Sequence, residues 1–372
     1  MRTMSYFSPP RLRCYAALPH GSTGIIAPSQ LSRMMSTAPG VSARAWPGLE
    51  RQDLQRADTR PLPEGVSFDE LDPAALAKDV HSYGVAKAVW SDILATAAEQ
   101  SRKQSWRTED LQEFGIDDFL QRHVLEHASL ACGLSVAIGS KLSANAQGGA
   151  DGRGVDYRAI LLSAFKADPD IVDAVACDIQ RFKEVDPATG SLLGVYLFYK
   201  GVQAVCCARV SHHYFTRRGD AGKLIAFLIQ SEMSEVYGVD IHPGCKLGKG
   251  ITIDHATGVV LGETAEVGDN VYLMHDVTLG ATGTSDTHDR HPKIRDGVFL
   301  GAKCTVLGNI VVGEGATVAA GAMVTKPVPA FHTAVGMPAK NRPPKEEAPL
   351  AMVNNAGERV ERINKINYAH AK

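Results

Sequence analysis

The chain has 372 residues, 44% of them hydrophobic and 22% charged, a balance typical of globular domains with a sizeable core. The formal net charge of −2 at pH 7 gives no indication of a nucleic-acid partner, and no apolar run is long enough for a membrane span. Seven cysteines without a Cys-x-x-Cys pair favour free thiols in a reducing compartment over a disulfide framework.

The first 49 residues differ from the rest of the chain in charge. They contain five arginines, no lysine and no acidic residue, and the first carboxylate is Glu50. An Arg-rich, Ser-rich segment without acids is typical of an organellar transit peptide, whereas the plainer alternative is a disordered cytosolic tail. We expect residues 1–49 to direct the protein to a mitochondrion or plastid rather than the cytosol. A linker is expected at residues 50–65.

Residues 66–235 carry helical periodicity. Val172, Val175, Ile179 and Phe182 recur at the three-four spacing of an amphipathic helix. The Gly-rich stretch QGGADGRG at 147–154 is typical of a loop between helices. The sequence therefore predicts an N-terminal domain built only of helices.

From residue 236 the hydrophobic period becomes six. Aliphatic or small residues recur at Ile241, Leu247, Ile253, Val259, Ala265, Val271 and Val277, and in a new phase at Ile294, Leu300, Val306, Val312, Val318 and Val324. This period predicts a parallel β-helix in which three hexapeptides make one coil of about 18 residues around an aliphatic column. The predicted fold class is α+β, with a left-handed β-helix over residues 236–330.

The interruption of the period, TLGATGTSDTHDRHPK at 278–293, is expected to leave the column as one protruding loop. Residues 331–372 are expected to form a C-terminal tail.

Histidines and aspartates gather in the β-helix, and the residues alone leave three hypotheses open. The first is a zinc hydratase site held by three histidines, although His255 and His275 are twenty positions apart rather than one regular coil. The second is general-base catalysis by His255, with Asp240, fifteen residues earlier, meeting it near the same corner on successive coils. The third is a non-catalytic scaffold subunit. For His242 and His275 we expect satisfied surface or corner positions.

Three motifs favour the second hypothesis, because DHATG (254–258), GETA (262–265) and DRHPKI (289–294) together resemble the serine acetyltransferases. These enzymes form a branch of the hexapeptide-repeat acyltransferases. The likeness extends upstream to DIQRFKEVDPA (178–188) and downstream to VGMPAK (335–340). The resemblance implies transfer of acetyl from acetyl-CoA to L-serine, the first committed step of cysteine biosynthesis from serine, without a metal.

The resemblance also assigns roles to individual residues. It makes His255 the general base and Asp240 the residue that orients it, and it gives serine binding to Asp186, Pro187, Asp254, Arg290 and His291. The chemistry of these side chains agrees, because a guanidinium suits the carboxylate of serine and aspartates suit its ammonium group. Acetyl-CoA is expected along the solenoid edge, near Ala281, Thr282, Ala302 and Ala320.

The resemblance further implies a homotrimer or hexamer. Many relatives also bind O-acetylserine sulfhydrylase through a C-terminal isoleucine, but this chain ends in Lys372, so that partner is left open. The loop reads Gly280-Ala281-Thr282-Gly283-Thr284 where the family often has Gly-Gly-Thr-Gly-Lys, which affects the expected contacts with CoA rather than the reaction.

Overall fold

The computed structural model describes residues 84–102, 115–145, 154–186, 188–217, 219–283 and 288–344. The predicted transit peptide, the linker, Pro187 and the last 28 residues lie outside these ranges. The described residues all belong to one compact unit, Ser67–Lys372. None of its described helices has the length and apolar character needed to cross a bilayer.

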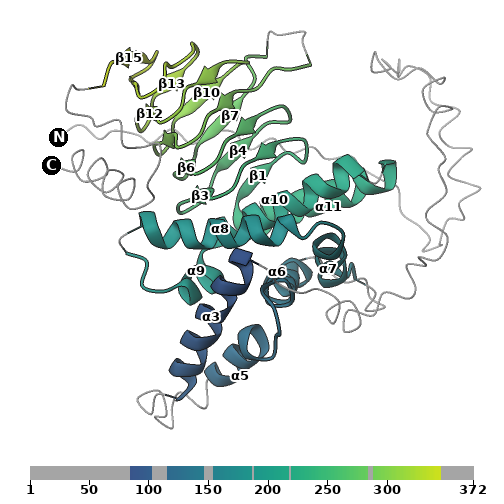
Figure 1. The fold of residues 1–372 in the computed structure, drawn as a ribbon. Helices are drawn as coiled ribbons and strands as arrows, with labels where there is room; N and C mark the ends of the chain where they lie inside the picture. The colour runs from purple at the N-terminus through teal and green to yellow at the C-terminus, as the bar shows by residue number, and fades with distance from the viewer. Residues whose placement is uncertain are drawn as a thin grey trace, which may run out of the picture. The chain divides into compact units, whose positions relative to one another are not determined.

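The N-terminal half is helical, as predicted. Its elements are α3 (Gly84–Arg102), α5 (Ile116–Leu120), the π-helical turn η4 (Gln121–Leu125), α6 (Leu130–Asn145), α7 (Tyr157–Ala167), α8 (Asp170–Val185), α9 (Leu192–Phe198), α10 (Lys200–Arg217) and α11 (Gly219–Tyr237). Figure 1 shows α8, α10 and α11 crossing beneath the first strands of the second half.

Short strands follow from residue 239. They are β1 (Val239–Ile241), β2 (Lys246–Leu247), β3 (Thr252–Ile253), β4 (Val259–Leu261), β5 (Glu266–Val267), β6 (Tyr272–Leu273), β7 (Thr278–Gly280), β8 (Lys293–Ile294), β9 (Phe299–Leu300), β10 (Thr305–Leu307), β11 (Val311–Val312), β12 (Thr317–Val318), β13 (Met323–Val324), β14 (Thr333–Val335) and β15 (Lys340–Arg342). The solenoid therefore continues past residue 330, where a tail was expected.

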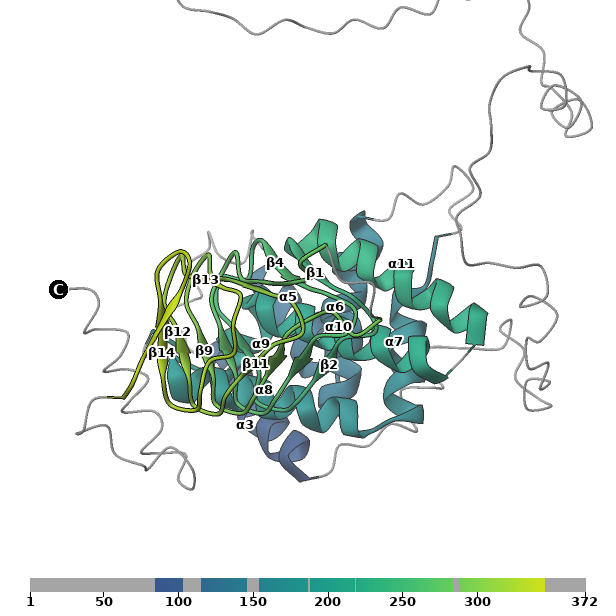
Figure 2. The same cartoon turned by 90° about the horizontal axis from the view of Figure 1, so that it is seen from above.

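The strands stack into three sheets, one for each side of a prism. Sheet A has the order β1-β4-β7-β10-β13, sheet B β11-β8-β5-β2 and sheet C β15-β14-β12-β9-β6-β3. All pairings between successive coils are parallel, and only β15 returns antiparallel to β14. Figure 2 shows the closed outlines of the successive coils. The predicted parallel β-helix is confirmed.

The buried positions agree with the predicted six-residue period, but the number of residues between stacked positions differs from one coil to another. Ile241 pairs with Leu261 and Ile253 pairs with Leu273, so the first coil spans twenty residues. From Ile294 to Val312 the regular spacing is eighteen. In most hexads two residues are buried, two positions apart, such as Val259 and Leu261, whereas Leu247 and Ile310 are only partly buried. The predicted positions from Val259 to Val277 are therefore the first buried residue of each pair, whereas Ile253 and the positions from Ile294 onward are the second.

The interruption of the period is shorter than predicted. Residues 278–280 form β7 and Lys293 begins β8, so only residues 281–292 leave the prism. Coil length across this loop is 27 residues, as the pairing of Leu273 with Leu300 shows. The loop adds nine residues to one coil without disturbing the stacking of the next.

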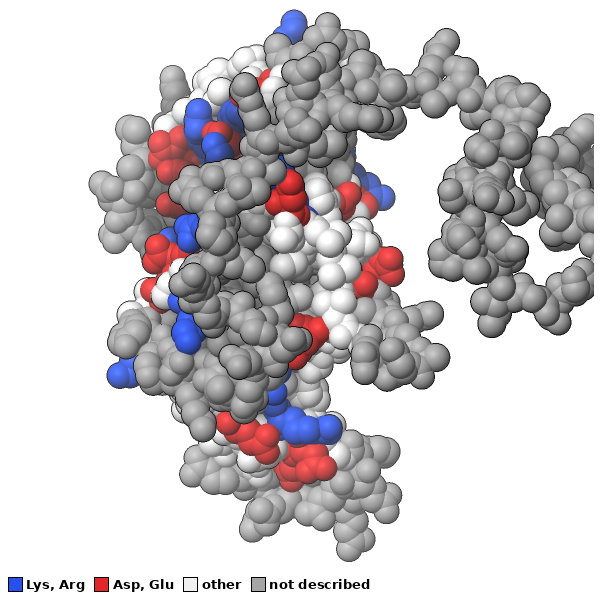
Figure 3. Space-filling model, turned by 90° about the vertical axis from the view of Figure 1, so that its right-hand side faces the viewer, with Lys and Arg blue, Asp and Glu red and all other residues white. Residues whose placement is uncertain are grey.

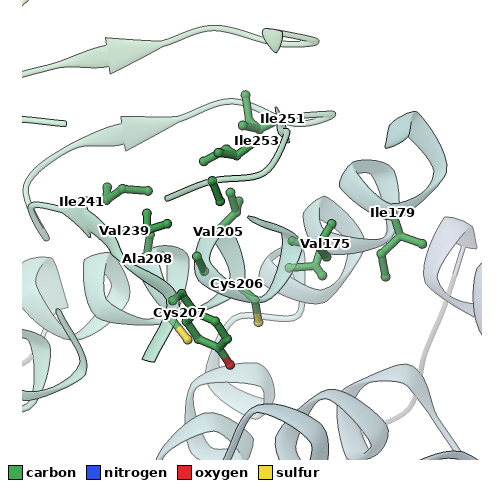
Figure 4. Packing of buried hydrophobic residues seen from close by; sticks show 14 of the residues in the cluster. Val175, Ile179, Val205, Cys206, Cys207, Ala208, Val239, Ile241, Ile251 and Ile253 are labelled. Atoms are coloured by element: carbon green, nitrogen blue, oxygen red, sulfur yellow. The ribbon is translucent and has the colours of Figure 1, made fainter. Parts of the chain in front are cut away.

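Helices and the first coil share one hydrophobic core. Figure 4 shows Val175, Ile179, Val205 and Ala208 of the helices near Val239, Ile241, Ile251 and Ile253 of the first coil, whereas the sulfur atoms of Cys206 and Cys207 point away from this coil. Among the described residues no further coil lies beneath this one, and the helices bury the end of the aliphatic column that water would otherwise reach.

A buried ion pair fixes this junction. Asp178 on α8 is fully buried and receives the Arg209 guanidinium of α10, with Nη2 and Oδ2 2.9 Å apart. Arg209 also donates to the carbonyls of Leu247 and Gly248, and the Ile251 amide donates to Asp178. Polar backbone groups at the open end of the solenoid thereby find partners in the helices.

Candidate active site

Most of the candidate residues on the β-helix lie on two edges of the prism. The C–A edge is the corner between sheets C and A, formed by residues 254–258, 274–276, 301–303 and 319–321 in successive coils. The A–B edge is the corner between sheets A and B, formed by residues 242–245, 262–265 and 281–292. A strand of sheet A with its flanking turns separates the two edges, roughly 15 Å at about 3.3 Å per residue.

The first turn of the C–A edge has two residues more than the turns above it. Five residues lie between Ile253 and Val259, against three between Leu273 and Val277. His255 and Ala256 both take left-handed backbone conformations, with φ of 58° and 60°. Such angles are uncommon outside glycine and persist only where surrounding contacts enforce them. The turn leaves the His255 side chain 71% exposed, while Ala256 is buried.

Backbone contacts hold this turn in place. The Thr257 amide donates to the His255 carbonyl at 2.7 Å, and the Gly258 amide donates to Gly238 at 2.7 Å. From the coil above, the Asp276 amide donates to the Thr257 carbonyl at 2.8 Å. The turn is thus tied to the coil above it and to the residue that precedes β1.

The start of α10 supports the same turn from below. Lys200 donates from Nζ to the Thr257 hydroxyl. At Gly201 a Cβ atom would lie 2.0 Å from the Ile253 carbonyl oxygen, so only glycine lets the helix approach this closely. Both helical contacts reach residues that flank His255.

The carboxylate of Asp254 lies beside His255. Oδ2 of Asp254 is 3.5 Å from Nε2 of His255, a separation that allows charge attraction but exceeds a good hydrogen bond. The Tyr272 hydroxyl in the coil above lies within hydrogen-bonding reach of Asp254. Burial raises the pKa of Tyr272, and the charges of Asp254 and Asp186 raise it further. Asp186, Asp254 and Tyr272 therefore form one group.

Asp186 reaches this group from the end of α8. Its carboxylate accepts hydrogen bonds from the Ala188 amide and the Thr189 hydroxyl, both at 2.9 Å. The preceding residue, Val185, packs against Tyr272. The helix end is thereby anchored to sheet C, which brings Asp186 toward the edge of the solenoid.

His275 stacks directly above His255. Because Ile253 pairs with Leu273, both histidines come two residues after paired positions. Their ring centroids are 5.8 Å apart, in an edge-to-face arrangement at 66°. The separation of twenty residues was expected to keep them out of register, and this was wrong because the first coil is itself twenty residues long. Nδ1 of His275 is buried without a hydrogen-bond partner, so the expectation of a satisfied corner residue was also wrong.

Arg290 and His291 lie on the A–B edge. The Arg290 guanidinium donates to Oε2 of Glu263 at 3.0 Å. The Thr264 amide donates to Nδ1 of His291 at 3.2 Å, and the amides of both Arg290 and His291 donate to the Thr264 hydroxyl at 3.1 Å. The His291 ring covers Gly262, where a Cβ atom would lie 2.1 Å from it. This end of the loop is therefore fastened to the turn that carries Glu263.

His242 lies in the same region, inside an aromatic cluster. Its ring meets Phe215 of α10 and Phe227 of α11 at centroid distances of 5.7 Å. Burial lowers the pKa of His242 and of His291, so both are neutral imidazoles at pH 7. Since Nδ1 of His291 accepts from a backbone amide, its proton is on Nε2.

Asp240 does not meet His255 within one chain. It accepts a hydrogen bond from Gln230 of α11 at 2.6 Å, and the carboxylate beside His255 is that of Asp254. The expected meeting assumed coils of regular length, whereas the first coil has twenty residues. Asp240 lies in the middle of β1, away from the C–A edge.

The four residues expected to contact acetyl-CoA are also divided between the C–A edge and the A–B edge. Ala302 and Ala320 continue the column of His255 and His275 along the C–A edge, because Leu273, Leu300 and Val318 are paired in register. Ala281 and Thr282 begin the loop at the A–B edge.

The sequence did not predict several residues that contact the candidate site residues on the two edges. Glu263 and Thr264 lie in the GETA motif, but their partners on the loop follow 27 positions later, a spacing no simple period reveals. Lys200 and Tyr272 carry no motif at all. Among the described residues no group of three or more His, Cys, Asp or Glu is arranged to hold a metal ion.

Comparison with protein families gives two matches. A model described as "Serine acetyltransferase, N-terminal" matches residues 89–207, and one described as "Bacterial transferase hexapeptide (six repeats)" matches residues 291–326. The serine acetyltransferase of Escherichia coli K12 is 38% identical over 252 residues, which cover 68% of this chain and 86% of the relative. Serine acetyltransferase 4 of Arabidopsis thaliana is 37% identical over 284 residues, covering 74% and 77%.

Solved structures give the same result. A serine acetyltransferase in complex with cysteine aligns with a TM-score of 0.63 at 35% identity, covering 70% of this chain and 95% of that one. Soybean serine acetyltransferase complexed with serine aligns at 0.62 and 39% identity, covering 70% and 100%. A serine acetyltransferase in complex with CoA aligns at 0.61 and 35%, covering 69% and 100%. With its helical half, its hexapeptide solenoid and these relatives, the chain belongs to the serine acetyltransferase family of acyltransferases.

Proposed function

We propose that the protein transfers the acetyl group of acetyl-CoA to the hydroxyl of L-serine, giving O-acetyl-L-serine and CoA. The observation that carries the proposal is the first turn of the C–A edge, where the exposed imidazole of His255 lies beside the Asp254 carboxylate. Relatives that align along about 70% of the chain have been solved with serine and with CoA, which supports the same two substrates here.

In this mechanism His255 acts as general base. It accepts the hydroxyl proton of serine while the hydroxyl oxygen attacks the thioester carbonyl, and it returns the proton to the sulfur that leaves as CoA. Transfer is direct, within a complex that holds both substrates, so positioning supplies much of the rate enhancement. The constrained backbone of the turn serves this purpose because it fixes the direction in which the imidazole projects.

Serine is recognised as a zwitterion. Asp186 and Asp254 form the side of the site for the ammonium group, with two carboxylates that already lie around Tyr272. Pro187, which follows Asp186 in the sequence, is proposed to bind serine with them and lies outside the described residues. Arg290 and His291 form the side for the carboxylate, where the guanidinium fork and the Nε2 proton of His291 supply donors. These two sides belong to different edges of one chain.

The division over two edges supports an active site shared by two copies of the chain. The C–A edge of one copy would face the A–B edge of its neighbour, and a rotation that closes after three copies makes a homotrimer with three equal sites. The acetyl-CoA positions follow the same plan, with Ala302 and Ala320 on one side and Ala281 and Thr282 on the other. Asp240 would then orient a neighbour's His255 rather than its own. Two trimers joined through their helical regions would give a hexamer.

The reaction would be the first committed step of cysteine biosynthesis in an organelle, with residues 1–49 as the targeting segment. Cysteine is expected to compete with serine, and a similar enzyme has been solved with cysteine.

Thiol release from acetyl-CoA tests the proposal. Protein lacking residues 1–49 is expected to release CoA only when L-serine is present, with O-acetyl-L-serine as the second product. Treatment with a chelator is expected to leave the rate unchanged, whereas loss of activity on zinc removal would favour a hydratase-type site instead. Absence of serine-dependent release would refute the proposal and favour a scaffold role.

A further inference from the structure

Tyr272 lies on the outer face of sheet C, next to the two carboxylates proposed to bind the ammonium group of serine. Its neighbour Leu273 fills the prism, and because successive side chains of a strand point to opposite faces, Tyr272 points outward. Its side chain is nonetheless covered, since the residue is only 5% exposed. The ring stacks on Phe299 of the next coil, with centroids 5.2 Å apart and planes at 24°, and Val185 at the end of α8 packs against it. These contacts hold the ring in one place.

Packing accounts for the ring of Tyr272 but not for its hydroxyl group. A phenyl ring would make the same contacts with Phe299 and Val185 without bringing a polar atom into the cluster. The hydroxyl lies within hydrogen-bonding reach of Asp254, the first residue of the turn after β3. The Asp254 amide donates to the Leu273 carbonyl at 2.8 Å, which continues the ladder of sheet C beyond β3 and keeps Asp254 beside β6.

The chemistry of the two groups determines which of them donates. An ionised carboxylate can only accept a hydrogen bond, whereas a phenol carries a proton to donate. Burial raises the pKa of Tyr272, and the negative charges of Asp254 and Asp186 raise it further, so the hydroxyl keeps its proton at neutral pH. Tyr272 is therefore the donor and Asp254 the acceptor.

The two carboxylates near Tyr272 are held in different ways. Asp186 accepts hydrogen bonds from an amide and a hydroxyl of the turn that follows it, both at 2.9 Å. In the described part of the chain no backbone amide donates to the Asp254 carboxylate, and Nε2 of His255 is 3.5 Å from it, farther than a good hydrogen bond. The hydroxyl of Tyr272 is therefore the group that can fix the direction of the Asp254 carboxylate.

We propose that Tyr272 is a positioning residue for serine binding, which donates a hydrogen bond to Asp254 and so turns that carboxylate toward the ammonium group of serine. The proposal rests on the acetyl transfer proposed above. A carboxylate that is already oriented loses less freedom when the substrate binds, so binding is tighter. The ammonium group takes no part in the bonds that form and break. Removing the hydroxyl is therefore expected to act on the KM for serine rather than on kcat.

Tyr272→Phe keeps the ring and removes only the donor. It is expected to raise the KM for L-serine about tenfold and to change kcat and the KM for acetyl-CoA by less than about threefold. Tyr214→Phe is the matched control, because Tyr214 is 6% exposed and its hydroxyl donates to the Ile160 carbonyl at 2.9 Å within the helical half. This control removes a similarly buried hydroxyl and should leave both KM values unchanged.

Two further measurements show whether Tyr272 acts through Asp254. Asp254→Ala removes the acceptor, so adding Tyr272→Phe to that variant is expected to change the KM for L-serine by less than about twofold. The second measurement uses 3-hydroxypropanoate, which keeps the hydroxyl and carboxylate of serine and lacks the ammonium group. Its inhibition constant against serine should differ by less than about twofold between Tyr272→Phe and the unsubstituted protein.

Four results would overturn the proposal. These are an unchanged KM for serine in Tyr272→Phe, a loss confined to kcat, an equal rise of KM when Asp254 is already alanine, and equal weakening of serine and 3-hydroxypropanoate. Circular dichroism and thermal unfolding of each variant identify loss of fold, and Tyr214→Phe shows the effect of losing a buried hydroxyl elsewhere. Failure of the acetyl transfer itself would appear earlier, as absence of serine-dependent CoA release by the unsubstituted protein.

Discussion

At the scale of single residues, His255 combines an exposed imidazole with a backbone that cannot rotate freely. Replacing His255 by alanine is expected to lower turnover about 10³-fold or more, because the hydroxyl of serine then loses its proton acceptor. Steady-state assay of CoA release measures this, with His332→Ala as a control at a distant corner. Near-normal turnover of His255→Ala would contradict the assignment of the general base.

His242 gives a prediction for the effect of pH on stability. Burial lowers its pKa in the folded protein, while Glu263 and Asp240 partly oppose this and Arg290 adds to it. The unfolded chain therefore binds a proton near pH 6.5 that the folded chain does not bind until a lower pH. Below about pH 6.5, unfolding is therefore accompanied by proton uptake at His242. The contribution of His242 thus lowers the stability of the folded state as the pH falls.

The substitution His242→Phe tests whether His242 lowers the stability of the folded protein as the pH falls. A phenyl ring keeps the contacts with Phe215 and Phe227 but removes the titration and the hydrogen bond from the Gly244 amide. The variant should be less stable at pH 7.5, by about 1 kcal/mol. Denaturant titrations at pH 7.5 and 5.5 should show that the unfolding free energy of the variant falls less between these pH values than that of the unsubstituted protein. An equal or larger fall in the variant would show that His242 does not contribute in this way.

At the scale of structural elements, the hexapeptide period predicted the buried residues correctly and concealed one insertion. Each coil has two buried tracks, two positions apart in most hexads. The turn at 254–258 contains exactly two additional residues, so the step from Ile253 to Val259 still measures six while it passes from one track to the other. An insertion of two residues equals the spacing between the two buried positions of a hexad. The six-residue period therefore continues across the insertion and does not reveal it. The turn that carries His255 was therefore predicted as regular.

The contact between α10 and this turn gives a second prediction. Gly201→Ala would place a Cβ atom 2.0 Å from the Ile253 carbonyl oxygen, which forces the helix away from the turn. We expect a loss of about 1–3 kcal/mol in stability together with reduced kcat, because His255 follows Ile253 by two residues. Thermal unfolding and CoA release measure the two effects.

Gly194→Ala is the matched control for Gly201→Ala. Gly194 is also helical, but a Cβ atom there would meet only the Ser191 hydroxyl at an ordinary 3.6 Å. Alanine is expected to leave activity unchanged and to stabilise the helix by up to about 1 kcal/mol. If both substitutions had the same effect, the close approach of α10 would not be what positions the turn.

At the scale of the whole molecule, the sequence named the candidate residues but did not predict their arrangement. The motifs DHATG and DRHPKI lie within 41 residues of each other, yet the register of the coils puts them on different edges. A linear motif contains no information about which corner of a prism it occupies when coils of twenty, eighteen and 27 residues follow one another. On the face shown in Figure 3, acidic and basic side chains are interspersed, so the described surface there gives no field of one sign.

The proposed sharing of the site between two chains gives the prediction that belongs to the assembled molecule. His255→Ala removes the base on the C–A edge, and Arg290→Ala removes the guanidinium on the A–B edge, which should mainly raise the KM for serine. When the two variants are co-expressed, some interfaces pair the intact C–A edge of an Arg290→Ala chain with the intact A–B edge of a His255→Ala chain. Random mixing makes about a quarter of the sites intact, because each side is independently intact in half of them.

Assay at low serine, where neither variant alone is active, should therefore recover about a quarter of normal activity from the mixture. The matched control combines His255→Ala with Asp254→Ala. Both of these changes lie on the C–A edge, so no arrangement of the two chains restores an intact site and activity should remain absent. A site built within one chain predicts no recovery from either mixture, since every chain then carries its own defect. Recovery in the first mixture alone requires that residues of two chains act together on one serine.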